Sequence, residues 1–339
     1  MLTRGGADAA ASLQRKEIVM KIIALEEAFS MHGLKLGDKI HAVPDVHASD
    51  EFKNLTGPRL FDFSEWRLPD MDENGINVQV LSLTAPGIQA ADSAEVAIAD
   101  ARTANDFLYD VIKQSPDRFR GFAALPMQDP AAAIEELRRC ILDLGFCGAL
   151  INDHTGGHYL DEPQFDAFWA ALVELDVPLY IHPGAPRVDH WHILDGHPNL
   201  VGPTWTWGVE TAGHAMRIVY GGVFDRHPKA KLILGHMGEY LPFQLWRLDS
   251  RYKTLASQNL QHLPSTYFGR NVFITTSGVF SHAALVGAIM AIGEDAVMFS
   301  IDYPFESSAE AVEFLRTAPI TSDQREKLAY VNAERILKL

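Results

Sequence analysis

The chain has 339 residues, of which 47% are hydrophobic and 22% are charged, and this composition excludes a disordered, collagen-like or disulfide-scaffold protein. The formal net charge of −15 disfavours phosphate backbones and anionic lipid, so we expect no nucleic-acid partner and no membrane association. The two cysteines, Cys140 and Cys147, form no disulfide framework and indicate a reducing, cytoplasmic compartment.

The first 19 residues contain Asp8 and Glu17 and lack the apolar core of a signal peptide. We predict a flexible extension over residues 1–19 and a folded domain over 20–339. Eight short runs of this domain are rich in β-formers, and most are continuously apolar, as in parallel strands that are buried on both faces. The predicted strands are 22–26, 78–83, 119–125, 148–152, 179–182, 232–236, 272–277 and 297–302.

Helical patterns follow the strands. Two have clear start signals: Asp129 before Pro130 is a typical N-cap, and Thr321 with Gln324 fits a capping box. The predicted helices are 93–114, 130–144, 164–175, 209–220, 239–257, 281–292, 308–317 and 322–337.

Eight strands, each followed by a helix, predict an α/β fold, the (β/α)8 TIM barrel. The rival is an open doubly wound sheet, but that fold usually has a glycine-rich phosphate loop after its first strand, and Leu25 to Ser30 is no such loop. The connections over 30–70 and 183–208 are too long for plain turns. We therefore predict long insert loops after strands 1 and 5, where barrels usually build substrate specificity.

Polar residues stand where four of the predicted strands end. They are Glu26 with Glu27 on strand 1, then His182, His236 and Asp302. A barrel brings the carboxyl ends of its strands to one mouth, so these distant residues converge there. Carboxylates with an imidazole make a divalent-cation site that leaves positions open for water or substrate. Taken singly, each residue has a plainer interpretation, such as a hydrogen-bonded core histidine, a turn cap or a solvated strand end.

Glu239 lies three residues after His236, at the expected start of a helix. A carboxylate beside an imidazole fixes its tautomer and raises its basicity, which suits a histidine that transfers a proton or polarises a substrate. Arg247, further along the same predicted helix, either pairs with an acidic neighbour or holds a substrate carboxylate. The loop after strand 5 also contains Trp205 and Trp207, which could stack on a planar ligand.

Five segments together resemble the amidohydrolase superfamily and, within it, the metal-dependent decarboxylases of hydroxybenzoates, which act on γ-resorcylate (2,6-dihydroxybenzoate), 2,3-dihydroxybenzoate or 5-carboxyvanillate. These segments are ALEEAF at 24–29, YIHP at 180–183, DGHPNLVGPTW at 195–205, FDRHPKAKLILGHMGE at 224–239 and SIDYPF at 300–305. The resemblance implies that Glu26, His182 and Asp302 bind the metal. It also implies that His236 is the active-site histidine, held by Glu239, that Asp302 donates a proton, and that Arg247 and Phe305 contact the substrate.

The resemblance departs from its pattern at Ala28, where hydrolytic members and γ-resorcylate decarboxylase have a second strand-1 ligand, a histidine. An alanine at position 28 resembles the pattern of the decarboxylases that act on 2,3-dihydroxybenzoate and carboxyvanillate. The loop at 195–205 instead resembles that of the γ-resorcylate decarboxylases. The smaller, oxygen-rich ligand set favours Mn²⁺ or Mg²⁺, with Zn²⁺ as an alternative.

The activity implied is the reversible, nonoxidative decarboxylation of 2,6- or 2,3-dihydroxybenzoate to a dihydroxybenzene and CO2, with one divalent metal ion and no organic cofactor. The expected partner is a small aromatic carboxylic acid, and the resemblance also implies a homodimer or homotetramer. Two alternatives stay open at this point. One is an amidohydrolase-type hydrolase of a cyclic ester or amide, and the other is a noncatalytic, metal-stabilised binding protein.

Overall fold

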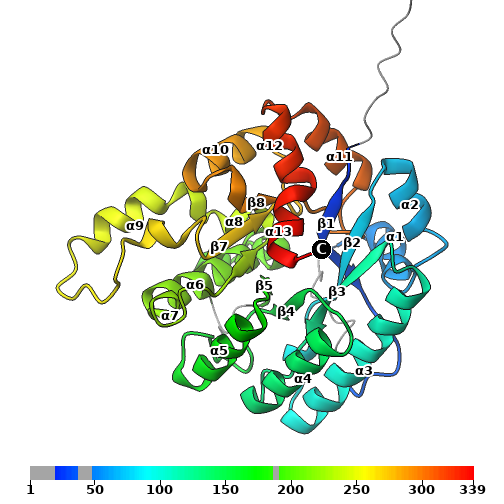
Figure 1. The fold of residues 1–339 in the computed structure, drawn as a ribbon, viewed down its shortest axis with the longest axis horizontal. Helices are drawn as coiled ribbons and strands as arrows, with labels where there is room; N and C mark the ends of the chain where they lie inside the picture. The colour runs from blue at the N-terminus through cyan, green and yellow to red at the C-terminus, as the bar shows by residue number, and fades with distance from the viewer. Residues whose placement is uncertain (1–19, 37–47, 186–190) are drawn as a thin grey trace, which may run out of the picture.

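The computed structural model describes residues 20–36, 48–185 and 191–339. The extension predicted over 1–19 lies outside these residues, and the predicted domain boundaries stay predictions. Eight parallel strands follow one another around a nearly closed barrel in chain order (Figure 1). They are β1 (Ile23–Phe29), β2 (Val78–Leu83), β3 (Phe119–Ala124), β4 (Gly148–Asn152), β5 (Leu179–His182), β6 (Leu232–Leu234), β7 (Val272–Thr275) and β8 (Val297–Met298).

Helices surround the strands (Figure 1). The strands are buried almost throughout, because each faces the barrel interior on one side and the helix layer on the other. The predicted (β/α)8 barrel is therefore confirmed. The helices are α1 (Asp50–Leu60), α2 (Arg67–Asn74), α3 (Ala94–Gln114), α4 (Pro130–Leu142), α5 (Asp166–Leu175), α6 (Thr206–Tyr220), α7 (Val223–Arg226), α8 (His236–Glu239), α9 (Leu245–Tyr252), α10 (His282–Ile292), α11 (Ser308–Thr317), α12 (Ser322–Glu326) and α13 (Asn332–Leu337).

The barrel closes between β1 and β8 through side chains as well as backbone. The predicted strand over 297–302 is too long, since β8 pairs with β7 only as far as Met298. Beyond that residue, the backbone N–H groups of Ile301 and Tyr303 donate to the two carboxylate oxygens of Glu27, over 3.0 and 3.1 Å. The carboxylate on β1 thus replaces the missing strand ladder and satisfies buried donors that would otherwise lack partners.

The long insert loop predicted after strand 1 contains two helices in its described part, α1 and α2, which were not predicted from the sequence. The side chain of Ser49 accepts a hydrogen bond from Phe52 N and begins α1, while Gly75, with a φ of 71°, ends α2. The insert after β5 contains short 3-10 turns, and α6 begins at Thr206, three residues earlier than predicted.

Two predicted helices are interrupted. Helix 239–257 is replaced by the turn α8, a 3-10 turn that contains Pro242, and then α9. Helix 322–337 is divided by a π-helical segment, Lys327–Val331, between α12 and α13. The two start signals are confirmed, since Asp129 caps α4 and Thr321 forms the capping box of α12.

Cys140 and Cys147 are free and buried, as expected of small core residues. None of the helices in the described part of the chain combines the length and the apolar character that crossing a membrane requires.

Candidate metal centre and active site

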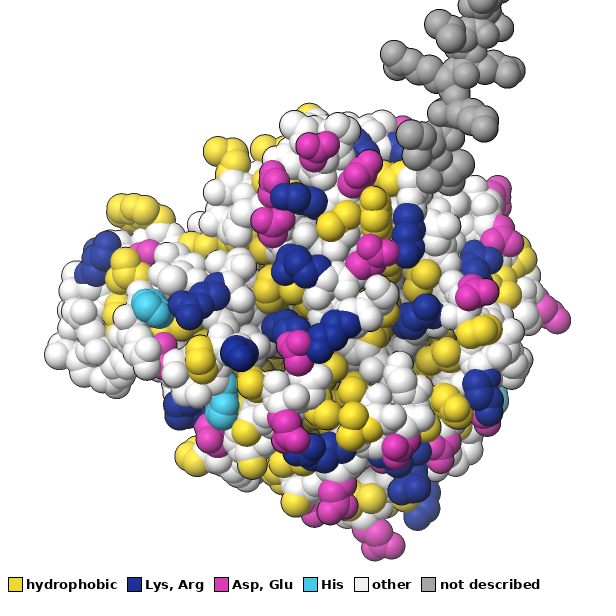
Figure 2. Space-filling model, viewed as in Figure 1, with side chains coloured by type: hydrophobic (Ala, Val, Ile, Leu, Met, Phe, Trp, Pro, Cys, Tyr) yellow, Lys and Arg dark blue, Asp and Glu magenta, His cyan; other side chains and the backbone are white. Residues whose placement is uncertain are grey.

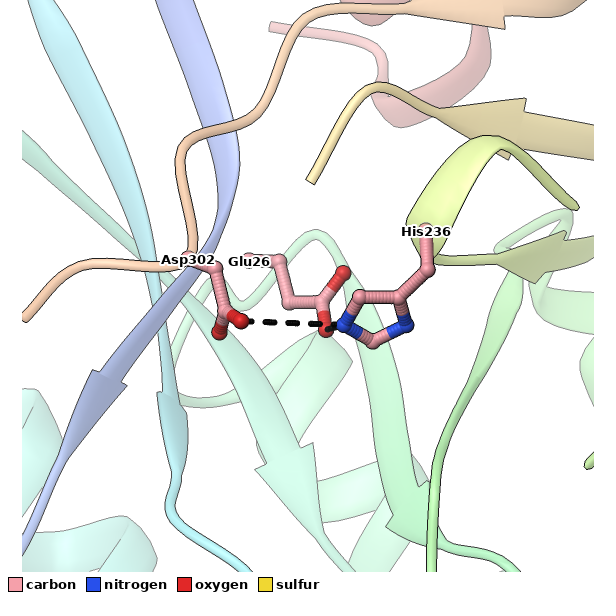
Figure 3. Close-up of side chains that lie close together, drawn as sticks. All are labelled: Glu26, His236 and Asp302. Atoms are coloured by element: carbon pink, nitrogen blue, oxygen red, sulfur yellow. Dashed lines mark ion pairs between the residues drawn. The ribbon is translucent and has the colours of Figure 1, made fainter. Parts of the chain in front are cut away.

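Three of the predicted side chains meet at the mouth of the barrel. Glu26 comes from β1, His236 follows β6 and Asp302 follows β8, and one candidate ligand atom from each lies within 4.8 Å of the other two (Figure 3). His236 Nε2 is 3.5 Å from Glu26 Oε1 and 3.6 Å from Asp302 Oδ2. Residues so far apart in the chain converge because parallel strands of a closed barrel end on one face.

One oxygen of the Glu26 carboxylate accepts a hydrogen bond, and the other makes only ion-pair contacts of 3.5 Å with His182 and His236. Tyr180, two residues before His182 on β5, donates its hydroxyl to Glu26 Oε2 and lies 2.8 Å from Thr275 Oγ1. Oε1 is buried and has no hydrogen-bond partner among the described residues. A buried, unpartnered acceptor is costly, and a cation is the partner that fits an oxygen so close to a second carboxylate. The donor set therefore fits a divalent metal ion.

Close packing behind Glu26 explains the glycine before His236. A Cβ at Gly235 would lie 2.6 Å from Glu26 Oε2 and 3.0 Å from the Tyr180 hydroxyl, so a larger residue would displace both. Burial raises the pKa of Glu26 to about 8, and this rise is opposed by His236 and reinforced by Asp302. A bound cation would reverse it by stabilising the charged carboxylate.

His236 is oriented by Glu239 through an unusual backbone turn. The Nδ1–H of His236 donates to Glu239 Oε1 over 2.6 Å, which leaves Nε2 facing Glu26 and Asp302. Backbone φ is positive at every residue from His236 to Tyr240, and each non-glycine residue in this region costs about 1–2 kcal/mol. The prediction that Glu239 stands at a helix start is therefore wrong. The strained turn, and not a helix N-terminus, brings its carboxylate back to the imidazole.

Charge on His236 follows from its acidic neighbours. Burial by itself lowers the pKa of this imidazole, but the carboxylates of Glu239 and Glu26 outweigh that effect and hold the pKa well above its ordinary value. The acidic neighbours of His236 therefore favour its protonated form.

His182 reaches the same carboxylate from the side of β5. Its Nδ1–H donates to the carbonyl of Pro183 over 2.9 Å, and its Nε2 lies 3.5 Å from Glu26 Oε1. Burial lowers the pKa of His182 to about 4, so the ring is neutral and Nε2 carries a lone pair, as a ligand requires. The set that meets within 4.8 Å contains His236 in place of His182. The two imidazoles thus share one carboxylate oxygen, and the division of roles between them stays a prediction.

Sequence reasoning missed two residues that hold the predicted ones. Tyr180 was hidden in an apolar strand, although its spacing of two from His182 places both side chains on one face. Glu27 was open to interpretation as a solvated strand end, yet its side chain is fully buried. Burial raises the pKa of Glu27 to about 7 in spite of the opposing backbone N–H groups of Ile301 and Tyr303 and the Arg67 charge. Two adjacent glutamates inside an otherwise apolar strand were the available signal.

A cavity of about 300 Å³ opens beside these residues, large enough for a single-ring ligand. Phe305 lines it, as does Trp207 on α6, one of the two tryptophans singled out from the sequence. Ala28 also lines the cavity, at the position where the related pattern has a histidine. Arg247 is not among the described lining residues, since it lies on the exposed side of α9, and its predicted substrate contact stays a prediction.

The cavity is acidic. Glu26, Glu239, Asp302 and Glu306 line it, and its described lining residues include no lysine or arginine. Such a site repels an anionic ligand unless a metal cation supplies positive charge. This is a second observation that fits a bound divalent cation, and it excludes a side-chain guanidinium or ammonium of the described lining as the partner of a substrate carboxylate.

Comparison with known proteins places the site in a family. The chain is 43% identical to the γ-resorcylate decarboxylase of Polaromonas sp. (strain JS666) over 326 residues, which cover 94% of this chain and 98% of that protein.

Two solved structures are also similar. The first is dihydroxybenzoic acid decarboxylase from Polaromonas sp. JS666 with bound manganese and the inhibitor 2-nitroresorcinol, at 40% identity and a TM-score of 0.89, covering 94% of this chain and 97% of that one. The second is 5-carboxyvanillate decarboxylase from Novosphingobium aromaticivorans, complexed with manganese and 4-hydroxy-3-methoxy-5-nitrobenzoic acid, at 35% identity and a TM-score of 0.87, covering 94% and 96%. The amidohydrolase family pattern matches residues 40–339. The chain therefore belongs to the amidohydrolase family.

Proposed function

We propose that this protein is a carboxy-lyase that catalyses the nonoxidative decarboxylation of 2,6-dihydroxybenzoate to a dihydroxybenzene and CO2, with one divalent metal ion, Mn²⁺ before Mg²⁺. The observation that carries the proposal is the meeting of Glu26, His236 and Asp302 at an acidic, aromatic-lined cavity, where one buried carboxylate oxygen accepts no hydrogen bond from the described residues. The names of relatives at 43–44% identity supply the substrate class.

The residues that would hold the ion are Glu26 and Asp302 with His182. His236 lies 3.5 Å from Glu26 and 3.6 Å from Asp302, and its ring centre is 6.1 Å from that of His182. When bound, the ion supplies a positive charge that attracts and orients the substrate carboxylate and its ortho hydroxyl. The roles of the protein's side chains in the reaction follow from that orientation and from the geometry of the protein.

The reaction exchanges a carboxylate for a proton on one ring carbon. Loss of CO2 leaves its bonding electron pair on that carbon, so a proton must arrive before or during departure. Asp302 is the proposed donor, because its carboxyl lies at the cavity wall and belongs to the group of candidate metal ligands. A proton from the substrate hydroxyl or from water restores it. His236, with its Nδ1–H held by Glu239, presents Nε2 3.6 Å from Asp302 Oδ2 and is the proposed relay or polarising group.

Hydrolysis of a cyclic ester or amide is disfavoured. That chemistry uses a metal-activated water, and Ala28 removes the second ligand that hydrolytic members contribute from the first strand. The relative and the two solved structures described above are also named decarboxylases. A noncatalytic binding protein gives no reason for the strained turn that aligns His236 with Glu239.

The test is CO2 release from 2,6-, 2,3- and 2,4-dihydroxybenzoate and from 5-carboxyvanillate, measured after chelation and again after Mn²⁺ is restored. We expect 2,6-dihydroxybenzoate to give the highest kcat/KM, chelation to abolish release, and Mn²⁺ to restore it. Preference for 2,3-dihydroxybenzoate or 5-carboxyvanillate would correct the isomer. Absence of release from all four acids, together with turnover of a lactone, would overturn the decarboxylase proposal in favour of the hydrolase.

The expected homodimer or homotetramer is supported by an exposed apolar surface on one projection of the molecule. α9 extends away from the barrel, and hydrophobic side chains lie on the surface of this projection (Figures 1 and 2). Phe243 is 56% exposed and Trp246 is 79% exposed. Large exposed aromatic side chains typically become buried in protein interfaces. Arg247 follows Trp246, so we assign it to this surface and not to the cavity of its own chain.

We also propose that the protein is located in the cytoplasm. Two free, buried cysteines among the described residues agree with a reducing compartment. Fractionation of the native cells with an antibody against the chain would test it, with the cytoplasmic fraction as the expected result.

A further inference from the structure

Glu27 and Asp302 are linked through the backbone on both sides of the aspartate. Glu27 Oε1 accepts the N–H of Ile301 over 3.0 Å and Oε2 accepts the N–H of Tyr303 over 3.1 Å. The two oxygens of one carboxylate therefore accept hydrogen bonds from the residues immediately before and after Asp302. Residues of β1 and of the segment after β8 are joined here without a regular ladder.

The segment around Asp302 has an unfavourable backbone conformation that its surroundings must stabilise. Asp302 has a φ of 82°, in the left-handed region that non-glycine residues seldom adopt. Such residues persist where the surroundings determine them. The carbonyl of Asp302 accepts the N–H groups of Phe305 and Glu306 over 2.8 and 3.1 Å, which fixes the turn after it. Before the turn, Ser300 N donates to Thr276 Oγ1 over 3.0 Å and Gly278 N donates to the carbonyl of Ile301 over 3.2 Å. Glu27 adds the side-chain contacts to the N–H groups on either side of Asp302.

The β1 side of the link is itself rigid. Ala28 N donates to the carbonyl of Tyr303 over 2.8 Å, so the two segments also touch through backbone. Arg67 is fully buried, donates to the carbonyl of Ala28 over 2.5 Å, and lies 4.4 Å from the ring centre of Tyr303. Its charge balances the buried carboxylate of Glu27. The carboxylate of Glu27 is thus fixed by its surroundings and is not a mobile side chain.

We propose that Glu27 is a positioning residue for Asp302: its carboxylate clasps the N–H groups of Ile301 and Tyr303 and so holds the Asp302 carboxyl against Glu26 and His236. The effect of Glu27 on catalysis depends on the proposed function. Its effect on the position of Asp302 does not, because it would hold for any use of the site. Neighbouring glutamates on β1 thereby have separate tasks. Glu26 faces the cavity, and Glu27 orders the residue that meets it there.

The test compares Glu27→Gln, which alters the contacts beyond the end of β8, with a matched variant that alters contacts at the start of β8. Gln keeps the shape but offers one acceptor oxygen for two N–H groups. Asn332 is the control, because its buried amide donates to the carbonyls of Glu294 and Val297, where β8 begins. Asn332→Ala removes a similar clasp far from the site. Glu27→Asp, which is shorter and keeps the charge, serves if the Gln variant does not fold.

Three measurements are made on each variant: a crystal structure, Mn²⁺ affinity from the electron paramagnetic resonance of free Mn²⁺, and kcat and KM for 2,6-dihydroxybenzoate. For Glu27→Gln we expect a displaced Asp302, Mn²⁺ affinity weakened about tenfold, and kcat lowered about 10- to 100-fold with KM changed less than threefold. Asn332→Ala should lose thermal stability comparably while keeping Mn²⁺ affinity and kcat.

Unchanged Asp302 geometry and Mn²⁺ affinity in Glu27→Gln would overturn the proposal, as would equal losses of Mn²⁺ affinity in Glu27→Gln and Asn332→Ala. If the wild-type protein released no CO2, the proposed function would fail alone, since the position of Asp302 in the crystal structure would still decide the role of Glu27.

Discussion

His236 and Glu239 are joined by a hydrogen bond of 2.6 Å that runs across a turn with positive φ at every position. The bond commits Nδ1 to the carboxylate and directs Nε2 to the cavity. Glu239→Gln can still accept from Nδ1–H but removes the negative charge that supports a protonated imidazole. We therefore expect kcat to fall about 10- to 100-fold.

The measurement for Glu239→Gln is the pH profile of kcat. Because the Glu239 carboxylate raises the pKa of His236, the profile should shift toward lower pH in the variant. Glu306→Gln, which changes a cavity-lining carboxylate outside the metal set, is the control. A profile identical to that of the wild type would exclude His236 from proton transfer.

Asp302→Asn should abolish turnover and leave the barrel folded. The amide can keep the hydrogen bonds of the turn through its unchanged backbone, but it carries no acidic proton for the ring carbon and is a weaker ligand for a hard cation. CO2 release and far-ultraviolet circular dichroism check the two halves of this prediction. Activity within threefold of the wild type would remove Asp302 from the mechanism.

The stability of the metal-free protein should fall as pH rises from about 6.5 to 8.5. Burial raises the pKa of Glu26 to about 8, above its ordinary value of 4.5, so the folded chain binds a proton there that the unfolded chain has released. Stability then declines with pH until Glu26 ionises in the folded state. Glu27, with a pKa of about 7, contributes in the same direction.

Mn²⁺ should reverse this trend, because it favours the ionised Glu26. Thermal unfolding at pH 6.5 and 8.5, with and without Mn²⁺, checks the prediction, and the metal-induced rise in Tm should be larger at the higher pH. In Glu26→Gln the decline should be smaller and the response to Mn²⁺ weak. A metal-free protein that gains stability over this interval would contradict the assignment.

Trp246→Glu should dissociate the proposed oligomer by placing a charge in an apolar interface. Light scattering after size-exclusion chromatography gives the mass directly. Leu142→Glu is the control, since Leu142 is 68% exposed at the end of α4, on a different part of the barrel surface. A monomeric wild type, or equal masses for the wild type and Trp246→Glu, would contradict the prediction.

Much of the barrel follows from local sequence patterns. The mainly apolar runs of β2, β4 and β5 predict those strands to the residue, and the apolar periodicity of α11 does the same for its helix. Such segments can be predicted from sequence because their own residues form the buried face. β8 is not readable in this way, because its end is determined by Glu27, a residue from the far end of the chain.

The site divides along the same line. The types and places of its residues, carboxylates and imidazoles at the ends of apolar strands, are properties of the sequence, and they suffice to predict a metal centre at the barrel mouth. The partners of those residues are not, because Tyr180 beneath Glu26, the strained turn that carries Glu239, and the distance of Arg247 from the cavity all depend on contacts between segments that are remote in the chain. Sequence alone determined most of the strands, the order of strands and helices, and the residue types at the site. The tertiary structure decided which atoms meet, because closure of the barrel sets the positions of side chains that no local pattern relates.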